Sequence, residues 1–360
     1  MSLAQPKRIL IIKLRHHGDV LLSTPVVDAL KTRFPDCEID MLVYAGTGQL
    51  IADNPQIAQI FTIDRNWKKL GVIKQLACEK NLFSKLKARD YDWAFNLSDQ
   101  WRAAIIAKLC ARCSVGFDCI KRDGFWWRFC HDFINHELDT SHHIVENQLN
   151  ILAPLIQPED VADAKVRLWV AQDARESMRQ KLREQGWNGE DYVLLHPGAR
   201  WHFKCWEDGK NAAIVQLLLN SGQNVVLTAS PDTVEQYMLQ EIIGRLNIPE
   251  GRKVYVLSGC LSLRELAAAI EGAKLFVGVD SAPMHIAAAL DKPQIALFGA
   301  SWVDKWRPYS EEAEVIYAGD YAELPHPDSI DTNDPTRLLK AIPLQDVWDR
   351  ISAKLEALEA

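Results

Sequence analysis

The stretch that decides the fold runs from 275 to 289 and reads Leu-Phe-Val-Gly-Val-Asp-Ser-Ala-Pro-Met-His-Ile-Ala-Ala-Ala. Its first five residues form a continuous apolar run with the length of a buried strand. Asp280 and Ser281 end that run, and Ser281 is a typical helix N-cap with Pro283 in the first turn of the helix that follows. The stretch therefore predicts a strand, a tight turn and a helix, the repeating unit of parallel α/β sheets.

The same unit recurs along the rest of the chain. In the second half, we expect strands at 192–196, 224–228, 274–279 and 294–298, and helices at 209–220, 233–246, 263–272 and 283–290. In the first half, we expect strands at 8–14, 38–43, 59–63 and 93–97, and helices at 72–89, 99–110 and 140–155. Short apolar strands that alternate with helices form parallel sheets covered on both faces. The chain is therefore predicted to be α/β, with two doubly wound domains that join near 158–160 and face a central cleft.

Length and composition set the broad class of protein. The chain of 360 residues is long enough for two domains, and its 48% apolar and 25% charged residues are typical of globular proteins. No run approaches the roughly 18 apolar residues of a membrane-spanning helix. The N-terminus lacks the apolar core of a secretory signal. We therefore expect a cytoplasmic protein without a transmembrane segment.

Charge is unevenly distributed along the chain. The net charge is −7, yet the segment 61–130 holds 14 Lys and Arg against 7 Asp and Glu, which gives +7 there and −14 elsewhere. A basic region inside an acidic protein indicates an anionic partner bound locally, although ordinary solvated helix faces would give the same count. An acidic chain without a recognisable nucleic-acid-binding motif is not expected to bind nucleic acid.

Eight cysteines include the pair Cys110 and Cys113, with Cys119, Cys130 and His131 downstream. This spacing would suit a zinc site or a redox pair. A single Cys-x-x-Cys without a second spaced pair is weak support for either, and buried thiols on a helix and the next strand account for the same residues. We therefore predict no metal site.

The turn at 280–281 has the properties of a phosphate-binding site. Ala282 and the alanines at 287–289 are small, so that a ligand can approach the backbone. The N–H groups and the positive dipole end of the helix favour a phosphate there. His285 lies one turn into the helix, and Asp280 could accept hydrogen bonds from N–H groups or from a ligand hydroxyl. An N-capped helix with an ordinary surface histidine is the simpler alternative.

A second polar motif follows the strand at 192–196 and reads His196-Pro-Gly-Ala-Arg-Trp-His-Phe-Lys-Cys-Trp206. Parallel α/β sheets bind ligands at the carboxyl ends of their strands, and Gly198 permits a tight turn there. The motif carries cationic donors for a diphosphate, although a solvated loop would carry them too. We predict that Lys204 contacts the phosphate and that Trp206 helps to place it.

A third motif, Lys13-Leu-Arg-His-His-Gly-Asp-Val20, follows the first strand. Gly18 lets the chain turn sharply, which puts Asp19 at the start of a helix. Asp is a frequent helix N-cap. A carboxylate that faces the cleft could instead remove a proton from an acceptor hydroxyl as that hydroxyl attacks an anomeric carbon. Position alone slightly favours the capping role.

Other candidates are acidic and basic side chains. Asp232 and Glu235 follow the strand at 224–228, where acidic residues often bind the ribose of a nucleotide. Six basic residues of the segment 61–130 could form an acceptor-binding surface, although a solvated charge accounts for each alone. They are Arg65, Lys68, Lys69, Lys121, Arg122 and Arg128.

Together, the three motifs resemble those of the ADP-heptose:lipopolysaccharide heptosyltransferases, glycosyltransferase family 9, over nearly the whole chain. The resemblance rests on the opening Ile-Leu-Ile-Ile-Lys-Leu-Arg-His-His-Gly-Asp-Val-Leu-Leu, the central His-Pro-Gly with Lys-x-Trp, and the late Val-Asp-Ser-x-Pro-x-His-Ile-Ala-Ala-Ala. The form Leu-Arg-His-His-Gly-Asp is most similar to the heptosyltransferase III branch. The resemblance implies the GT-B fold of two Rossmann-like domains, with an acceptor domain at 1–160, a nucleotide-sugar domain at 161–343, and a final helix at 344–360 that packs back on the first domain.

The resemblance also implies a reaction. The family transfers a heptose from ADP-L-glycero-D-manno-heptose to the inner core of lipopolysaccharide, inverts the anomeric centre and requires no cofactor or metal. Asp19 is then the general base, and Lys204 offsets charge on the departing ADP. The basic region fits an acceptor that carries phosphates and carboxylates, which would make the protein peripheral on the inner face of the cytoplasmic membrane. By the same resemblance, the ADP-heptose donor contacts Asp232, Asp280, Ser281, Ala282 and His285.

The sequence departs from the family's pattern at one place, and three alternative functions remain open. Many family members have Thr-Gly after the aspartate where this chain has Ser281-Ala282, and the added methyl group limits how closely the diphosphate approaches. The alternatives are heptosyltransferase I or II activity, a sugar-nucleotide epimerase or hydrolase of the same architecture, and a non-catalytic nucleotide-sugar-binding protein. An epimerase or hydrolase would consume ADP-heptose without an acceptor. In a binding protein, Asp19→Ala would change no turnover.

Overall fold

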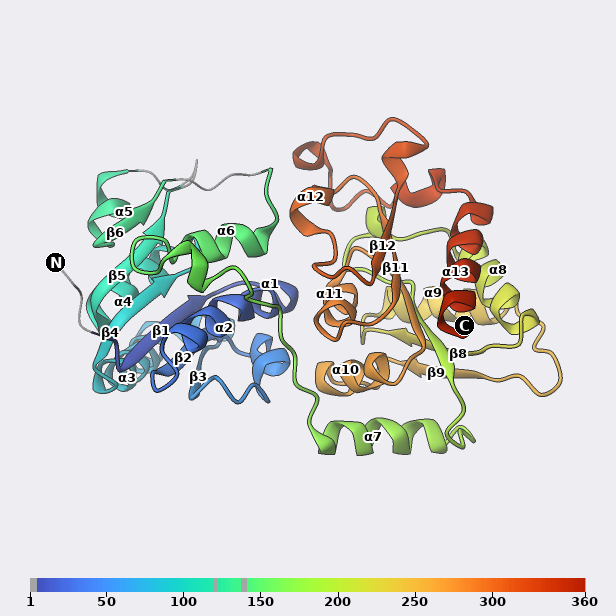
Figure 1. Ribbon diagram of the computed structural model, residues 1–360, viewed down its shortest axis with the longest axis horizontal. Coiled ribbons are helices and arrows are strands. Elements are labelled where there is room, and N and C mark those ends of the chain that lie inside the picture. The colour runs from blue at the N-terminus through green and yellow to red at the C-terminus, as the bar shows by residue number, and fades with distance from the viewer. Residues whose placement is uncertain (1–4, 119–121, 123, 137–140, 360) are drawn as a thin grey trace. The chain divides into compact units, whose positions relative to one another are not determined.

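The computed structural model describes residues 5–118, 122, 124–136 and 141–359, and the chain divides into two compact units, 1–169 and 170–360. Each unit contains one six-stranded parallel sheet with helices packed on it (Figure 1). The sequence predicted the joint at 160, but residues 161–169 stay with the first unit. Arg167 holds this segment there, because its side chain pairs with Asp28 at 2.8 Å and its backbone N–H donates to Thr24 Oγ1 at 2.9 Å.

In the first unit, the strand order is β3-β2-β1-β4-β5-β6 and every neighbouring pair is parallel. The strands are β1 (Arg8–Lys13), β2 (Glu38–Tyr44), β3 (Gln59–Ile63), β4 (Tyr91–Asn96), β5 (Ala111–Phe117) and β6 (Phe133–Asn135). The helices are α1 (His17–Leu21), α2 (Thr24–Arg33), α3 (Val72–Ala88), α4 (Trp101–Cys110), α5 (Phe125–Phe129) and α6 (Ile144–Asn150), with the 3-10 turns η1 (Thr47–Ile51), η2 (Arg65–Lys69) and η3 (Pro158–Asp160). The central strand β1 is buried in all but its first residue, as expected for a strand covered on both faces.

In the second unit, the order is β12-β11-β10-β7-β8-β9, again all parallel. The strands are β7 (Tyr192–His196), β8 (Asn224–Ala229), β9 (Val254–Ser258), β10 (Leu275–Val279), β11 (Gln294–Phe298) and β12 (Ala313–Tyr317). The helices are α7 (Gln172–Arg183), α8 (Asp208–Asn220), α9 (Thr233–Ile243), α10 (Leu263–Glu271), α11 (Ala282–Ala289), α12 (Val303–Trp306) and α13 (Leu344–Glu359), with the 3-10 turns η4 (His202–Lys204), η5 (Ala318–Asp320), η6 (Pro327–Ser329) and η7 (Leu338–Ala341).

Both sheets have a point at which the strand order reverses. In each sheet, the first three strands along the chain follow one another toward one edge, and the last three follow one another toward the other edge. The reversal therefore lies between β1 and β4 in the first sheet and between β7 and β10 in the second. Ligands of doubly wound sheets bind outside the carboxyl ends of the strands at this point. The fold therefore provides one such position in each unit.

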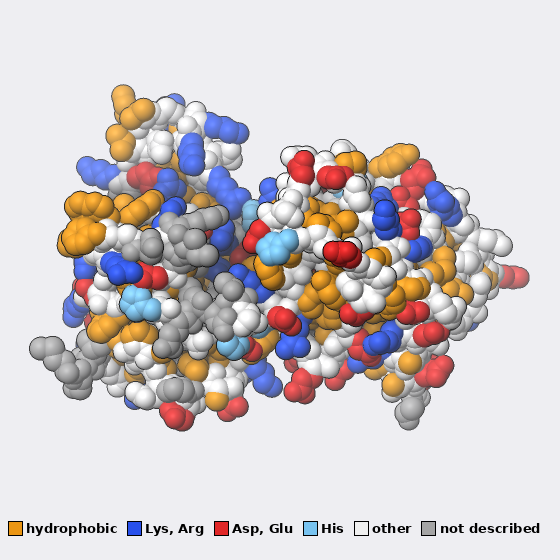
Figure 2. All heavy atoms as spheres, turned by 90° about the horizontal axis from the view of Figure 1, so that it is seen from above, with side chains coloured by type: hydrophobic (Ala, Val, Ile, Leu, Met, Phe, Trp, Pro, Cys, Tyr) orange, Lys and Arg blue, Asp and Glu red, His pale blue; other side chains and the backbone are white. Residues whose placement is uncertain are grey.

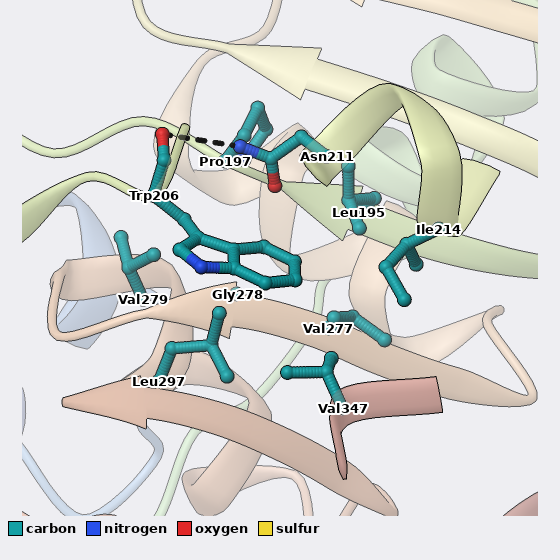
Figure 3. Close-up of a pocket in the computed structure, with 10 residues that line it drawn as sticks. All are labelled: Leu195, Pro197, Trp206, Asn211, Ile214, Val277, Gly278, Val279, Leu297 and Val347. Carbon is teal, nitrogen blue, oxygen red and sulfur yellow. Dashed lines mark hydrogen bonds between the residues drawn. The ribbon is translucent and has the colours of Figure 1, made fainter. Parts of the chain in front are cut away.

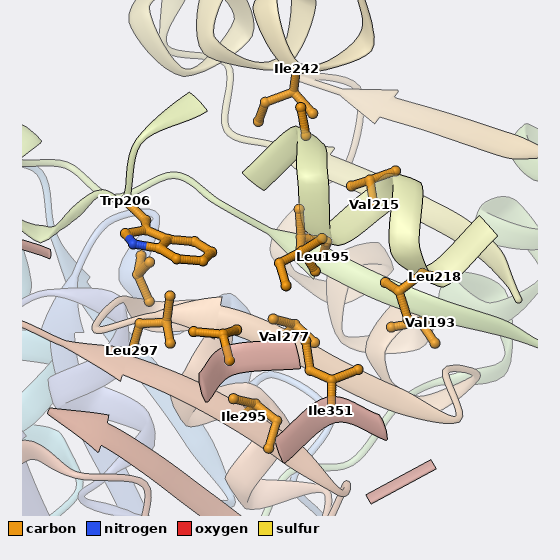
Figure 4. Close-up of a cluster of buried hydrophobic side chains, with 14 of the residues drawn as sticks. Val193, Leu195, Trp206, Val215, Leu218, Ile242, Val277, Ile295, Leu297 and Ile351 are labelled. Carbon is orange, nitrogen blue, oxygen red and sulfur yellow. The ribbon is translucent and has the colours of Figure 1, made fainter. Parts of the chain in front are cut away.

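The final helix packs in the core of the second unit, which corrects the expectation that it packs on the first. Its buried residues Val347, Ile351 and Leu355 recur every four positions and form one apolar stripe. The stripe belongs to the cluster that contains Val193 and Ile295 of the sheet, and the helix contacts α8 and β11 (Figure 4). Among the helices of the described residues, none combines the length and apolar character needed to cross a bilayer.

Candidate functional site

The reversal point of the second sheet brings two of the predicted motifs together. Strands β7 and β10 are neighbours, and Gly278 lies opposite His196 in their register. The loop that ends at Trp206 therefore leaves the sheet beside the turn that precedes α11. These are the motifs that the sequence predicted to bind the nucleotide sugar.

Lys204 and Asp280 form an ion pair at this point. The distance from Lys204 Nζ to Asp280 Oδ2 is 2.5 Å, and the two side chains are 16% and 6% exposed. Lys204 Nζ also lies 5.3 Å from the ring centre of Trp201 and 5.9 Å from that of Phe203, whose rings stack on each other. Because an ammonium group has three N–H donors, Lys204 can keep Asp280 and still donate to a ligand anion.

The start of α11 is arranged as an anion site. Ser281 is the N-cap residue, but its hydroxyl does not cap the helix and donates instead to the Val279 carbonyl at 3.2 Å. The first N–H groups of α11 therefore have no side-chain cap from Ser281, which suits a bound phosphate. Ser281 and Ala282 are half-buried, whereas His285 is only 6% exposed. His285 is thus a buried histidine one turn into α11, and the alternative of a surface histidine is wrong.

Trp206 anchors the loop that carries Lys204 to the apolar core. Its side chain is 1% exposed and lies in the apolar core, next to a small cavity of about 10 Å³ whose lining includes Val277, Leu297 and Val347 (Figure 3). Asn211 of α8 donates to the Trp206 carbonyl at 3.4 Å. The ring is therefore an anchor for the end of the loop that carries Lys204.

The acidic residues after β8 have different surroundings. Asp232 is exposed and caps α9, because its Oδ1 accepts from the N–H of Val234 at 2.8 Å. Glu235 is buried and faces His196, with 3.8 Å between Glu235 Oε2 and His196 Nε2. Burial lowers the pKa of His196, and the Glu235 carboxylate only partly opposes that effect. Of the two candidates, Glu235 is the one that contacts the end of β7.

The reversal point of the first sheet carries Asp19. The chain leaves β1 through Arg15 and His16, and His16 is the N-cap of α1. Asp19 lies in the first turn of α1, so the interpretation of Asp19 as the N-cap is wrong. Within the described residues its carboxylate has neither a hydrogen bond nor an ion pair, and the residue is half-buried. The carboxylate is thus oriented by the backbone alone.

A cationic cavity of about 320 Å³ opens beside this point in the first unit. Arg65 lies on the ring of Tyr44, with 4.1 Å from the guanidinium carbon to the ring centre. Arg15 pairs with Asp99 at 3.6 Å, and Arg102 pairs with Glu79 at 2.6 Å. The cavity is lined by Leu14, Arg15, His16, Tyr44, Arg65, Lys68, Gln100 and Arg102.

The structure brings together only some of the predicted acceptor residues. Arg65 and Lys68 line the cavity, and Lys69 is exposed on the same turn, η2. Arg122 donates through Nε to the Asp99 carbonyl at 2.8 Å. Arg128, on α5, instead pairs with Asp118 at 3.1 Å. Lys121 lies outside the described residues.

Sequence reasoning missed part of the cavity lining. It overlooked Arg15, His16 and Arg102, although Arg15 and His16 belong to the motif that contains Asp19. Their position directly after β1 was the available signal, because a ligand at the reversal point must contact that loop. Arg102 had a similar signal, since it lies in the first turn of α4, the helix that follows β4 at the same reversal point.

Among the described residues, the cysteines form no cluster with other potential metal ligands, and Cys119 lies outside these residues. Cys110 and Cys113 are free and buried, and burial raises the pKa of each thiol to about 11. Within the described ranges, no group of three or more His, Cys, Asp or Glu side chains is arranged to hold a metal ion. The buried thiols fit the interpretation of packing residues on a helix and the next strand.

Comparison with known proteins connects these features to a family. Residues 80–336 match the family model described as glycosyltransferase family 9 (heptosyltransferase). The chain is 38% identical over 335 residues to lipopolysaccharide heptosyltransferase 3 of Escherichia coli, which covers 93% of this chain and 95% of that protein. A crystal structure of a family 9 glycosyltransferase from Veillonella parvula superposes with a TM-score of 0.83 at 21% identity and covers 99% of both chains.

The structure named E. coli ADP-heptose lps heptosyltransferase II superposes with a TM-score of 0.77 at 22% identity, and covers 98% of this chain and 100% of that one. The two parallel six-stranded sheets match these structures, so the fold is GT-B, as the sequence predicted. The family model and the 38% identity agree with each other. The chain therefore belongs to glycosyltransferase family 9 as a lipopolysaccharide core heptosyltransferase, close to type 3.

Proposed function

We propose that the chain transfers a heptose from ADP-heptose to the inner core of lipopolysaccharide with inversion at the anomeric carbon, as a type III enzyme. The similarity to heptosyltransferase 3 over 93% of the chain supports the type. ADP-heptose is part of the name of the solved E. coli heptosyltransferase II, which supports ADP-heptose as the donor.

The observation that carries the proposal is the Lys204–Asp280 pair at the N-terminus of α11. The departing group of the reaction is ADP, on which negative charge develops as the glycosidic bond breaks. A buried ammonium group and the N–H groups of a helix N-terminus stabilise such charge more strongly in the transition state than in the bound donor. Asp280 holds Lys204 in place, since their 2.5 Å contact fixes the ammonium group at the end of β10.

Asp19 is proposed as the general base. Inversion requires the acceptor hydroxyl to attack opposite the departing ADP, and a carboxylate can take the proton of that hydroxyl as the bond forms. The Asp19 carboxylate has no competing hydrogen bond or ion pair within the described residues. Burial lowers the pKa of neighbouring His17, and His16 and Arg65 lower it further. His17 is therefore mainly uncharged at neutral pH and adds no positive charge beside Asp19.

The cationic cavity is proposed to hold the anionic groups of the acceptor. Arginine binds phosphate and carboxylate through two parallel N–H donors, and Arg15, Arg65 and Arg102 all line the cavity. Lys68 adds a fourth cationic group to the lining. Since the proposed acceptor is carried by a lipid, the proposed location of the enzyme is the cytoplasm, at the inner face of the cytoplasmic membrane.

The test compares the wild type with Asp19→Asn, using ADP-heptose and purified inner-core acceptor, and follows both ADP release and acceptor mass. We expect one heptose to be added per acceptor, and the variant to lose at least roughly a hundredfold in kcat, a typical general-base contribution. Asp36→Asn is the matched control, because Asp36 is an exposed aspartate of the same unit, outside the proposed site.

Each outcome bears on a separate part of the proposal. ADP release by the wild type without a gain in acceptor mass would indicate a hydrolase. Transfer by Asp19→Asn at the rate of the wild type would leave the transferase and remove Asp19 as the base. Transfer to the inner core only at the positions used by type I or II enzymes would correct the type.

A further inference from the structure

Two segments of the first unit expose large apolar side chains that folding does not use. Directly after η2 and on the first turns of α3, Val72 is 74% exposed and Ile73 is 85% exposed. On α5, Phe125 is 73% exposed and Trp126 is 69% exposed. We call these side chains the apolar rim, which comprises Leu70, Val72, Ile73 and Leu76 of the first segment and Phe125, Trp126 and Phe129 of α5.

The α5 part of the rim is held rigidly outward. Trp127 is fully buried and donates from Nε1 to the Phe117 carbonyl at 2.8 Å, which fixes the inner face of the helix. The rings of Phe125, Trp126 and Phe129 contact one another, with centre-to-centre distances of 5.3, 6.3 and 6.5 Å. The helix therefore buries one aromatic ring and presents a cluster of three to solvent.

Both segments belong to one layer and one edge of the first unit. The connections from β3 to β4, β4 to β5 and β5 to β6 all run in the same direction across the sheet, so right-handed crossovers put α3, α4 and α5 on the same face. Arg102 of α4 pairs with Glu79 of α3 at 2.6 Å, and Trp101 of α4 meets Trp127 of α5 at 5.5 Å. The N-termini of these helices follow the carboxyl ends of strands, where the cationic cavity opens.

Charge beside the rim distinguishes between possible occupants. Residues 64–76 contain four cations and a single carboxylate. That carboxylate, Asp64, already caps η2 by accepting from the N–H of Asn66 at 2.8 Å. Figure 2 shows hydrophobic side chains gathered beside Lys and Arg side chains on the first unit. A second copy would bring like charges together, whereas an anionic lipid surface would neutralise them. The four cations are Arg65, Lys68, Lys69 and Lys74.

We propose that the apolar rim inserts into the headgroup region of an anionic phospholipid bilayer and holds the mouth of the cationic cavity against the membrane surface. Exposed aromatic and aliphatic side chains flanked by cations are the combination that binds membrane interfaces. The benefit for a lipid-linked acceptor rests on the proposed function, but the lipid binding itself does not.

The test measures sedimentation of the full chain with vesicles of phosphatidylcholine alone and of an equal mixture of phosphatidylglycerol and phosphatidylcholine. We expect binding to the mixed vesicles only, and weaker binding as salt is raised. The variant Ile73→Ser with Trp126→Ser should lower the partition coefficient at least about tenfold, since each substitution removes a large apolar side chain from the interface. The control is Val234→Ser with Tyr237→Ser, which removes side chains that are 47% and 63% exposed on α9 of the second unit.

Activity on two acceptors separates this proposal from the proposed function. On a soluble core oligosaccharide without lipid, the rim variant should match the wild type. On acceptor embedded in mixed vesicles, it should fall by the same factor as its binding. The absence of turnover with either acceptor in the wild type would count against the proposed function alone.

Three results would overturn the membrane proposal. The first is a wild type that binds neither kind of vesicle, and the second is a rim variant that binds as well as the wild type. The third is a wild-type dimer in solution scattering that the rim variant converts to a monomer, because the rim would then be an interface between two copies of the chain.

Discussion

Lys204 and Asp280 lie 76 positions apart in the chain, and they meet because β7 and β10 are neighbours in the sheet. The pair makes the site nearly neutral before a ligand binds. A diphosphate then adds charge to a place where a cation and helix N–H groups are already oriented, so little reorganisation is needed during the reaction. Under the proposed function, Lys204 stabilises the leaving group and Asp280 positions Lys204.

We expect Lys204→Gln to lower kcat by roughly a hundredfold to a thousandfold, the usual loss when one donor to developing charge is removed. Lys204→Arg should retain more activity because it keeps the charge. Thermal melting serves as the control, since a merely structural role would lower the melting temperature of Lys204→Gln without a specific loss in kcat. Equal kcat for Lys204→Gln and the wild type would remove Lys204 from the reaction.

The sequence and the geometry favour different acidic residues as the candidate for binding the ribose of ADP. The sequence favoured Asp232, but the structure uses that carboxylate as a helix cap and buries Glu235 against His196. We expect Glu235→Gln to weaken ADP binding by about tenfold in calorimetry, as for the loss of a hydrogen bond to a charged group. Asp232→Asn should leave the affinity unchanged. A larger loss in Asp232→Asn than in Glu235→Gln would restore the first assignment.

Individual residues could be predicted where the backbone determined their place. Lys204, Asp280 and Asp19 follow the ends of strands, so their position at a reversal point could be inferred from the sequence alone. The interactions of side chains could not be inferred in this way. Arg128 was expected to bind the acceptor, but it pairs with Asp118, and only the packing of α5 beside β5 explains that contact.

Helices and strands differ in how far the sequence determined them. The buried strands β1, β7, β10 and β11 lie within a residue of their predicted bounds, because each is a continuous apolar run. Strands β5, β6, β9 and β12 were not predicted from the sequence. Strand β5 contains Arg112 and the buried Ser114, whose hydroxyl bonds to Asp132 at 2.8 Å and to the Cys130 carbonyl at 3.3 Å. Strand β9 was missed although Val254 to Leu257 is a continuous apolar run, and its place at the edge of the sheet leaves alternate residues only half-buried.

Helix α10 offers a test at the scale of an element. Its N-cap is a capping box, in which Ser262 and Glu265 bond to each other's backbone N–H groups, and Glu265 Oε1 also contacts Lys181 of α7 at 2.5 Å. Burial alone would raise the pKa of Glu265. The hydrogen bonds from Lys181, Ser177 and Ser262 outweigh that effect and lower the pKa from 4.5 to about 2.

Because the pKa of Glu265 is lower in the folded chain, its carboxylate stabilises the fold fully above about pH 4.5, and this contribution is lost as the pH falls through about 2. We expect Glu265→Gln to lower the free energy of unfolding at pH 7 by about 1 kcal/mol, a typical cap contribution. The difference from the wild type should shrink between pH 4.5 and pH 2. Urea unfolding across this range measures it, with Glu250→Gln, an exposed glutamate, as the control. A difference that does not depend on pH would contradict the role of the carboxylate.

At the scale of the whole molecule, each unit is one uninterrupted stretch of chain with its own sheet and core. The sequence predicted two domains because the alternation of strands and helices occurs twice. It could not determine where α13 packs, because an amphipathic stripe specifies that a helix is half-buried but not which surface covers it. The surface is supplied by α8 and β11.

Two substitutions test whether the cores are independent. Ile351→Ala removes a fully buried side chain from the second core, and Ile12→Ala does the same in the first. Each should cost about 2–5 kcal/mol of stability. By hydrogen exchange, we expect Ile351→Ala to speed exchange in α8 and β11 while β1 and β2 stay protected, and Ile12→Ala to do the converse. Faster exchange in both units from either substitution would show that the cores are coupled.

The place of α13 also bears on how the chain folds during synthesis. Since all six strands of the first sheet lie within residues 1–169, every one of them is translated before the strands of the second unit. At about 5–20 residues per second, translation of the remaining chain leaves the first unit on the order of ten to forty seconds to fold by itself. The second unit is completed later, because its core needs α13, which follows all six of its strands along the chain. The core of the second unit therefore depends on α13, and a truncation that removes this helix should send the second unit, rather than the first, to chaperones and proteases.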